Sequence, residues 1–354
     1  MGVASVHLRV IPGHRSGRFS TRVPCSPTRS LSGRIANPYT LRVAKDSGRA
    51  VVLVSGGDAC TPFTTPASAC RSGMPAGITN SHLRDHLLDR GLRVFTAPAS
   101  NRRGQVVPPG PDTADCFDDC PEPLGAHLTI TSTADIDLAG ERLARFVEYL
   151  HHHHGVDCID LVGHSNGGLF SRSAIRVLRD TESPVAVASL STLGAPWHGS
   201  FALRFLAGEI DVTACAGDAW CEQMLSTVAE EAASNDLGLC AQNTVGYLDG
   251  PHGWNAAQAG VLDDVPVLLV GGDRFGHSDG DRELWPFDGL VSLHSALGRN
   301  APPSVLADPE TLIRPDTHSI YLSRALGLSD DTGLTGDPEV LERVGGFITS
   351  VPTR

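Results

Sequence analysis

The sequence lacks any run of about 18 apolar residues, the length that a transmembrane helix needs, so we expect no membrane-spanning segment. Its first residues also lack the apolar core of about 7 to 15 residues that marks a secretory signal peptide. Lysine is almost missing, because Lys45 is the only one in the chain. Arginine supplies the other cations, which we interpret as a compositional bias.

Acidic residues are scarce only at the start of the chain. Residues 1–49 contain nine Arg or Lys residues and one acid, Asp46, a charge of about +8, which leaves about −20 for the rest out of a total of −12. An acidic body argues against nucleic acid as a partner, because phosphate binding requires a basic face. The 41% of hydrophobic residues suffices for a sizeable core, so we do not expect disorder of the whole chain.

The nine cysteines include three close pairs in loop-like surroundings: Cys60 with Cys70, Cys116 with Cys120, and Cys215 with Cys221. Such pairs are typical of stapled loops in an oxidising compartment, which predicts a secreted or cell-envelope protein. A set of unrelated free thiols is the alternative. An odd count leaves at least one thiol unpaired, and we expect it to be Cys158, inside an apolar strand.

The chain divides by composition into a start and a body. Residues 1–45 are rich in Ser, Arg, Pro and Gly, which predicts a leader or a disordered basic arm. From residue 46 to residue 354, short apolar runs alternate with helical periods, as in a mostly parallel, doubly wound sheet flanked by helices. Two insertions interrupt this pattern, one near 101–125 and one near 200–262, and the second could form a cap or lid.

Five short apolar runs predict the strands of that sheet, at 51–54, 92–97, 156–162, 185–193 and 265–270. Apolar residues at helical spacing predict helices at 139–150 and 169–178. The first of these helices ends in four histidines, 151–154. Consecutive residues fan around a helix and cannot converge on one ion, so we expect a solvated helix end rather than a metal site.

Residues 163–167 (GHSNG) fit the pattern G-x-S-x-G, and Ser165 is its serine. An apolar strand precedes the pentapeptide and a helical pattern follows it. This strand–turn–helix context is that of a nucleophile elbow, in which a strained turn exposes the serine hydroxyl. A glycine-rich turn with a bystander serine is the alternative.

A serine hydroxyl is a weak nucleophile and needs a histidine base that a carboxylate holds in place. The order expected here is Ser, then Asp or Glu, then His. Asp288 and His318 lie in successive loops after the last predicted strand, and we favour them. The competing acids are Asp273, Asp279 and Asp281, and the competing histidines are His252, His277 and His294.

The negative charge of a tetrahedral intermediate requires an oxyanion hole of two backbone amides. One should come from Asn166, the residue after the nucleophile, and the other from the loop after the first strand. Gly57 is our candidate in that loop, with Asp58 as the alternative. A plain turn is the other interpretation of residues 55–57.

Three segments resemble the lipase branch of the α/β-hydrolases. Residues 163–172 (GHSNGGLFSR) are similar to the lipase elbow with its following Gly-Gly-Leu-x-x-Arg, and 193–200 (LGAPWHGS) to Gly-x-Pro-His-x-Gly-Ser. The stretch that begins at Asp288 (DGLVSLHSA) is similar to the segment that holds the lipase catalytic acid. The chain has Ser55-Gly56 where such lipases have His-Gly, and Ile320 where calcium-binding members have Asp, so we expect no such calcium site.

The resemblance implies an α/β-hydrolase fold and hydrolysis of carboxylic esters, including triacylglycerols, by Ser165, Asp288 and His318. It implies an ester or lipid substrate and contact with lipid aggregates, and we expect no cofactor and no metal. Two alternatives remain: an acyltransferase that uses the same triad, and a binding protein of hydrolase shape without catalysis.

Overall fold

The computed structural model describes residues 48–68, 78–101, 124–233, 240–250 and 252–352. The chain divides into two units, Met1–Leu41 and Arg42–Arg354, and every described residue belongs to the second. The predicted leader, 1–45, and most of the insertion predicted near 101–125 lie outside the described residues.

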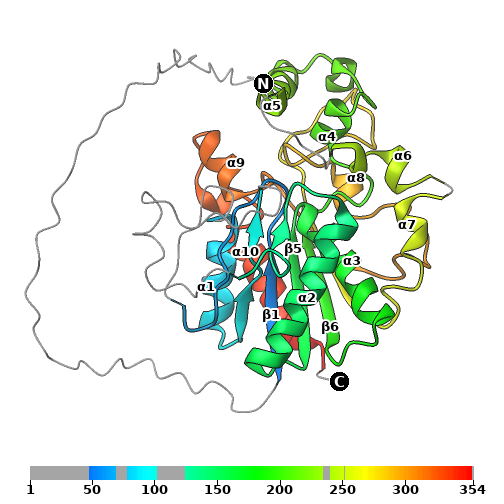
Figure 1. Ribbon diagram of the computed structural model, residues 1–354. Coiled ribbons are helices and arrows are strands. Elements are labelled where there is room, and N and C mark those ends of the chain that lie inside the picture. Colours follow the sequence, from blue (N-terminus) through cyan, green and yellow to red (C-terminus); the bar gives the residue numbers. More distant parts are fainter. Residues whose placement is uncertain (1–47, 69–77, 102–123, 234–239, 251, 353–354) are drawn as a thin grey trace, which may run out of the picture. The chain divides into compact units, whose positions relative to one another are not determined.

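A six-stranded sheet forms the centre of the second unit, with the order β2-β1-β5-β6-β7-β8 (Figure 1). Its strands are β1 (Arg49–Val54), β2 (Val94–Thr96), β5 (Cys158–His164), β6 (Ala186–Leu193), β7 (Val267–Gly272) and β8 (Glu310–Arg314). All five neighbouring pairs are parallel. A mostly parallel sheet flanked by helices was the predicted fold class, and the prediction is confirmed. A separate two-stranded parallel sheet joins β3 (Ala99–Ser100) to β4 (Ile130–Thr131).

Five of the six main strands were expected from apolar runs, but β8 was not. The side chains of Glu310, Thr311 and Ile313 are exposed in this edge strand, so its sequence carries no buried apolar run. Its position is fixed by backbone pairing with β7, which a pattern of hydrophobicity does not report.

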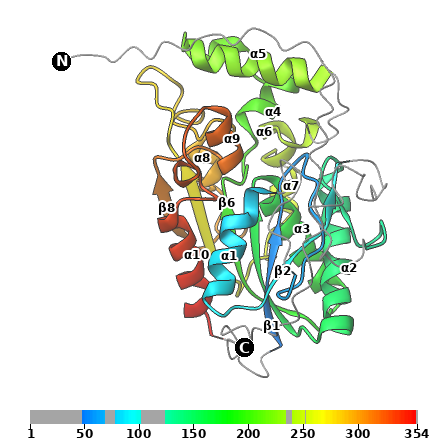
Figure 2. The same cartoon turned by 90° about the vertical axis from the view of Figure 1, so that its left-hand side faces the viewer.

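Helices cover both faces of the sheet (Figures 1 and 2). Alternate residues of β1 face opposite ways: Ala50, Val52 and Val54 belong to the core with α2 and α3, whereas Val51 and Leu53 belong to the core with α1 and α10. This period of two, with apolar residues at every position, is what a strand buried on both faces requires. The bounds of these helices are α1 (Ser81–Asp89), α2 (Ile136–His154), α3 (Asn166–Asp180) and α10 (Pro338–Ser350).

The register of the sheet brings the ends of its strands together. Val54 of β1 pairs with Gly163 of β5, and His164 pairs with Leu193 of β6. Ser55, Ser165 and Gly194, which follow these strands, therefore emerge side by side. Ligands of parallel α/β sheets bind at this carboxyl edge, so the register places the elbow serine where a site is expected.

Residues between β6 and β7 add helices outside the main sheet. They are α4 (Phe201–Leu206), α5 (Ala219–Ala233), α6 (Val245–Leu248), α7 (Trp254–Ala257) and the 3₁₀ turns Val212–Cys215 and Cys240–Gln242. The remaining short helices are α8 (Leu293–Ala296), α9 (Ile320–Ala325) and the 3₁₀ turns Ile78–Asn80 and Asp330–Thr332.

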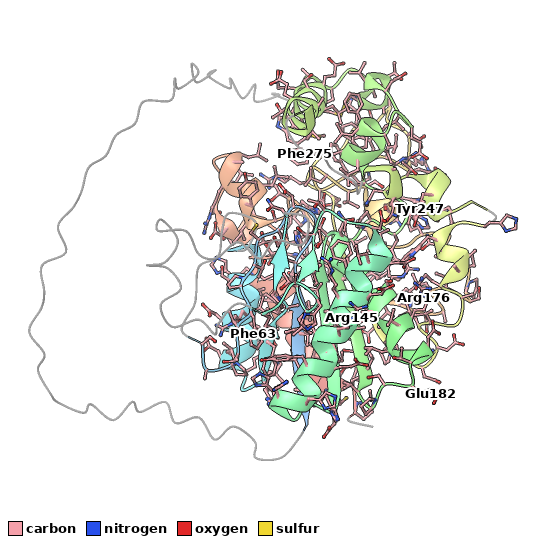
Figure 3. All side chains as sticks on the ribbon, in the orientation of Figure 1. Phe63, Arg145, Arg176, Glu182, Tyr247 and Phe275 are labelled. Carbon is pink, nitrogen blue, oxygen red and sulfur yellow. A yellow bond between two sulfur atoms is a disulfide. The ribbon has the colours of Figure 1, made fainter. Side chains whose placement is uncertain are left out.

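A third apolar cluster joins α4 and α5 to the loop before Asp288, and we call it the cap cluster. Its buried members are Phe201, Cys215, Cys221, Leu225, Leu284, Trp285 and Phe287. On its edge the rings of Trp220 and Phe275 stack with centroids 4.0 Å apart. Phe275 is labelled in Figure 3. The first part of the segment that the sequence predicts as a cap thus packs in a separate apolar cluster, whereas Leu248, Trp254, Val261 and Leu262 of the same segment belong to the sheet core with α2 and α3.

The cysteines follow the predictions in part. Cys215 and Cys221 form a disulfide that joins a 3₁₀ turn to α5, and Cys158 is a buried free thiol, as expected. The predicted pairing of Cys60 is wrong, because Cys60 is a free thiol that donates to Asn101 Oδ1 at 3.0 Å. Cys116 and Cys120 lie outside the described residues. Among the described helices, none has the length and apolar character needed to cross a bilayer.

Candidate active site

Ser165 lies at the turn between β5 and α3, in a conformation that few non-glycine residues adopt. Its φ is 55° and its ψ is −133°, outside the regions that L-residues prefer. The side chain is half-exposed, although both neighbouring residues are buried. Strain of this kind costs about 1 to 3 kcal/mol and persists only where surrounding structure enforces it.

Three glycines of the motif permit this turn through close packing. A Cβ on Gly163 would lie 2.5 Å from the carbonyl carbon of Gly167, and a Cβ on Gly167 would lie 2.3 Å from the Val54 carbonyl oxygen. A Cβ on Gly168 would lie 2.6 Å from Cβ of Ala195. Any larger residue at these positions would push the elbow away from β1 or β6.

His318 and Asp288 form a buried pair. Nδ1 of His318 donates to Oδ2 of Asp288 at 2.7 Å, and the two side chains are 3% and 0% exposed. The other carboxylate oxygen of Asp288 accepts from the backbone amides of Leu290 and Val291 at 2.9 and 2.8 Å. With all its oxygens engaged, the carboxylate holds the imidazole in the tautomer that leaves Nε2 free to accept a proton.

The competing residues occupy other surroundings. Asp279 and Asp281 are exposed, and Asp281 accepts from the backbone amide of Glu283. His252 is exposed, and His277 packs against the Trp285 ring. His318 therefore pairs with Asp288, the acid that the sequence favoured; Asp273 is half-buried at the end of β7.

His164, the residue before the nucleophile, connects the elbow to the His318 loop, and the sequence did not single it out. Its Nε2 donates to the His318 carbonyl oxygen at 3.0 Å, and the two rings lie 4.7 Å apart. Complete burial, with a smaller effect of His318, lowers the pKa of His164 to about 3. A neutral imidazole at this position keeps the donor that the carbonyl requires.

Two further glycines lie against the site. A Cβ on Gly194 would lie 2.9 Å from Nδ1 of His318 and 3.0 Å from Oδ2 of Asp288. A Cβ on Gly56 would lie 2.6 Å from Cβ and 3.3 Å from Oγ of Ser165. The loop after β1 thus lies against the serine, and the loop after β6 lies against the His–Asp pair.

The residues predicted for the oxyanion hole flank this arrangement. Asn166 is buried at the start of α3, and Gly57, next to Gly56, is half-exposed. The alternative, Asp58, has a φ of 56° and an exposed side chain that accepts from Asn101 at 3.0 Å. The start of α3 favours negative charge, because its first amides have no partner within the helix.

Arg172, the arginine of the resembling elbow segment, is fully buried. Its guanidinium lies 4.0 Å from the centre of the Trp197 ring and 4.7 Å from that of Trp254. Burial lowers its pKa to about 9, an effect that the Asp249 carboxylate opposes. Two of the motif segments, around Ser165 and around Trp197, are therefore packed together by a cation between aromatic rings.

No group of three or more His, Cys, Asp or Glu side chains is arranged to hold a metal ion within the part of the chain that the structure describes. Ile320, at the position where calcium-binding lipases carry an acid, is completely buried at the start of α9. A buried isoleucine cannot ligate calcium, which takes oxygen ligands. The absence of a cofactor, and of a metal at the positions that the sequence offered, remains a prediction.

The structure contains a parallel sheet with helices on both faces and a strained serine between β5 and α3. It also contains a His–Asp pair in the loops after β7 and β8. Their order along the chain is Ser, Asp, His. The chain has the α/β-hydrolase fold. Residues 126–205, less than a quarter of the chain, match a family described as "Putative serine esterase (DUF676)", over a segment that includes α2, the elbow and β6. The chain is similar to that family over this segment.

Solved structures also align with the α/β-hydrolase. The mature lipase BlEst2 of Bacillus licheniformis is 13% identical, with 86% of this chain and 92% of that chain covered and a TM-score of 0.46. The product of the gene lin2722 of Listeria innocua is 18% identical, with 86% and 95% covered and a TM-score of 0.45. A thermostable carboxyl esterase of Bacillus coagulans is 12% identical, with 86% and 90% covered and a TM-score of 0.45. No curated protein sequence matches the chain significantly.

Proposed function

We propose that this α/β-hydrolase cleaves carboxylic esters through an acyl-enzyme, with Ser165 as nucleophile, His318 as general base and Asp288 as the acid that orients His318. The observation that carries the proposal is the buried hydrogen bond of 2.7 Å between His318 and Asp288, in the site that also contains the strained Ser165. A buried carboxylate–imidazole pair beside an exposed hydroxyl is the arrangement that activates a serine.

The reaction proceeds in two steps. Nε2 of His318 accepts the Ser165 proton as Oγ attacks the ester carbonyl carbon, and the backbone amides of Asn166 and Gly57 donate to the oxyanion. Collapse of this intermediate breaks the bond to the leaving alkoxide, which takes the proton from His318. A water molecule then attacks the acyl-enzyme with His318 again as base, and the acid and free Ser165 result.

Apolar side chains next to the His–Asp pair favour an acyl group as part of the substrate. A Cβ on Gly289, the residue after Asp288, would lie 2.5 Å from Leu322, 3.3 Å from Phe275 and 3.7 Å from Trp220. These side chains come from α9, the cap cluster and α5. We therefore propose an ester or lipid substrate, with triacylglycerol as one candidate and contact with lipid aggregates through the cap.

The disulfide Cys215–Cys221 is consistent with an oxidising compartment. On this basis we propose that the protein works in the cell envelope or outside the cell. Mass mapping of the protein from its native host without reduction tests this: a reduced Cys215 and Cys221 would contradict it.

The decisive experiment is turnover of p-nitrophenyl esters from short to long acyl chains by the wild type, Ser165→Ala and Ser226→Ala. Ser226 is an exposed serine of α5 and provides the matched control. We expect turnover by the wild type and the control, and a loss of roughly 10⁴-fold or more for Ser165→Ala. Absence of turnover of every ester by the wild type, or equal turnover by Ser165→Ala, would overturn the proposal. Transfer of the acyl group to an added alcohol would indicate the acyltransferase.

A further inference from the structure

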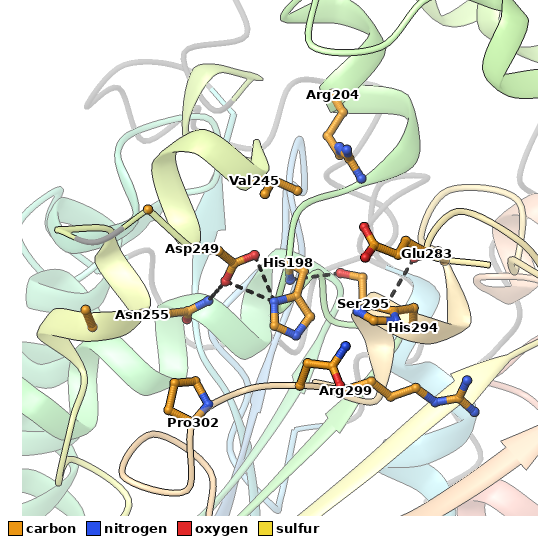
Figure 4. A pocket seen from close by; sticks show the side chains of 14 residues that line it. His198, Arg204, Val245, Asp249, Asn255, Glu283, His294, Ser295, Arg299 and Pro302 are labelled. Carbon is orange, nitrogen blue, oxygen red and sulfur yellow. Dashed lines mark hydrogen bonds and ion pairs between the residues drawn. The ribbon is translucent and has the colours of Figure 1, made fainter. Parts of the chain in front are cut away.

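A cavity lies outside the set of residues proposed for catalysis (Figure 4). It is a cavity of about 440 Å³, and its lining contains none of Ser165, Asp288 and His318. The side chains that matter for its chemistry are His198, Asp249, Asn255, Glu283, His294 and Arg299.

His198 is held in a fixed orientation by a carboxylate. Its Nδ1 lies 2.9 Å from both oxygens of Asp249, and Asp249 also accepts from Nδ2 of Asn255 at 2.7 Å. Because a carboxylate only accepts, Nδ1 carries the hydrogen, and the neutral ring presents a lone pair at Nε2. This Nε2 is buried and has no hydrogen-bond partner among the described residues. A histidine that ligates a metal almost always donates its other ring N–H in this way.

His294 provides a second imidazole in the same cavity. Its ring centre lies 5.4 Å from that of His198, and the ring planes are inclined by 54°. With metal–nitrogen bonds of about 2.1 Å and a tetrahedral angle, the centres of two coordinating imidazole rings lie about 5 Å apart. The separation of the two ring centres is therefore close to that of two imidazole ligands of one ion.

The charges around the cavity are mixed. Arg204 is engaged by Glu209 at 2.7 Å, whereas the exposed Arg299 acts on His294 against a positive charge. Asp249 and Glu283 act on His294 in the opposite sense. Glu283 adds an exposed carboxylate to the lining. Since no three described side chains already converge on one point, water would occupy the positions that the two imidazoles leave open.

We propose that His198 and His294 form a site for a divalent transition metal, with Zn²⁺ as its type, in which Asp249 orients His198 and water completes the coordination. Imidazole nitrogen is a ligand that Zn²⁺, Ni²⁺ and Cu²⁺ prefer, whereas Mg²⁺ and Ca²⁺ prefer oxygen. The site goes beyond the proposed esterase function and does not depend on it.

Metal binding here would connect two loops, one that contains Asp288 and one that lies against the His318–Asp288 pair at Gly194. The amide of His198 donates to Oγ of Ser295 at 2.9 Å, and that hydroxyl donates to the Gly199 carbonyl at 2.8 Å. Oγ of Ser200 donates to the Leu290 carbonyl at 2.9 Å. One loop begins at Gly194 and the other at Asp288, so an ion on His198 and His294 would add a fourth link between them.

The test measures binding of Zn²⁺ by calorimetry and of Co²⁺ by its visible absorption, on the full chain. The parent carries His152→Gln and His153→Gln, because these exposed histidines could bind ions by themselves. We expect one ion per chain in the parent, a loss of affinity of at least tenfold in His198→Gln and in His294→Gln, and a loss of about 10- to 100-fold in Asp249→Asn. His252→Gln, an exposed histidine outside the cavity, is the matched control and should bind like the parent.

X-ray absorption of the Zn²⁺ complex of the parent provides a second measurement that needs no change in the cavity. Two imidazole ligands and two oxygen ligands are expected. Absence of binding by the parent, affinity unchanged in both His198→Gln and His294→Gln, or a spectrum without two imidazoles would overturn the proposal. Because none of these readouts is activity, failure of the metal site and failure of the esterase are distinguishable.

Discussion

His318 and His198 each have Nδ1 held by an aspartate, and the two pairs differ in what surrounds them. In the pair His318–Asp288 the side chains are 3% and 0% exposed, and the second carboxylate oxygen is held by two backbone amides. In the pair His198–Asp249 they are 11% and 27% exposed, and both carboxylate oxygens face the imidazole. The first pair lies in the site of a strained serine, whereas the second faces a cavity with another imidazole.

An aspartate can thus prepare a histidine for two different roles. In both pairs the carboxylate fixes the tautomer, so the free nitrogen is Nε2. The function then depends on what Nε2 meets, a hydroxyl in one proposal and a metal ion in the other.

Removing the carboxylate from each pair in turn should have different effects on ester hydrolysis. We expect Asp288→Asn to lower kcat/KM for ester hydrolysis by about 10³ to 10⁴, because an amide at this position favours the wrong tautomer of the base. The decrease in kcat/KM for Asp249→Asn should be at least about a hundredfold smaller than that for Asp288→Asn, since Asp249 contacts His198 rather than His318. Steady-state kinetics on one ester measures both, and comparable losses would contradict the assignment of His318–Asp288 as the catalytic pair.

Gly194 offers a second way to disturb the catalytic pair alone. In Gly194→Ala the new methyl group would lie 2.9 Å from Nδ1 of His318, so we expect kcat/KM to fall by about 10- to 100-fold, as for a misplaced catalytic group. Gly155→Ala is the matched control, because Gly155 has a similar φ of 61°, against 59° for Gly194, and nothing within 4 Å of the new methyl group. Both variants should lose stability because of the positive φ, and Gly194→Ala should lose more because of the close contact with His318. Only Gly194→Ala should lose activity, and full activity in Gly194→Ala would contradict this account.

His164 should act on the catalytic pair through the backbone of His318. In His164→Leu the carbonyl of His318 loses its donor, which costs about 1 kcal/mol, and we expect kcat to fall by up to about tenfold with little change in KM. Since burial lowers the pKa of His164 to about 3, this residue stays neutral between pH 5 and pH 9. The pH profile of kcat should therefore keep its shape in the variant. A displaced profile would show that His164 titrates during turnover.

The smallest effect should come from the loop that precedes His318. Burial, together with the neighbouring carboxylate of Asp337, raises the pKa of Asp316 to about 8; Arg314 and Arg274 oppose this. The folded state then holds a proton that the unfolded chain, with a pKa of about 3.9, releases, so stability falls as pH rises from about 4 to about 8.

In Asp316→Asn the side chain at this position no longer binds or releases a proton. We expect the difference in melting temperature, variant minus wild type, to increase by a few degrees between pH 5 and pH 8.5. Thermal unfolding followed with circular dichroism measures it. Asp331→Asn, at an exposed carboxylate, is the control and should show no such gain. A constant difference between Asp316→Asn and the wild type across this range would contradict the raised pKa.

The sequence alone determined features that depend on neighbours along the chain. The runs that form β1, β5, β6 and β7 are apolar because both faces of these strands are buried. The turn at Ser165 was predictable because a strand, two glycines and a helix lie within a few residues of it. The sequence could also favour Asp288 and His318, which the structure joins by a hydrogen bond, since the fold fixes which strands the proposed acid and base follow.

Only the tertiary structure decided what depends on residues far apart. His198 and Asp249 are separated by 51 positions, and no local pattern relates them. The cation of Arg172 between two tryptophans, the contact of His164 with the carbonyl of His318, and the exposed strand β8 likewise arise from sheet register and packing. Local sequence encodes backbone conformation and burial, but the partner that a buried polar group finds is set by the arrangement of the whole chain.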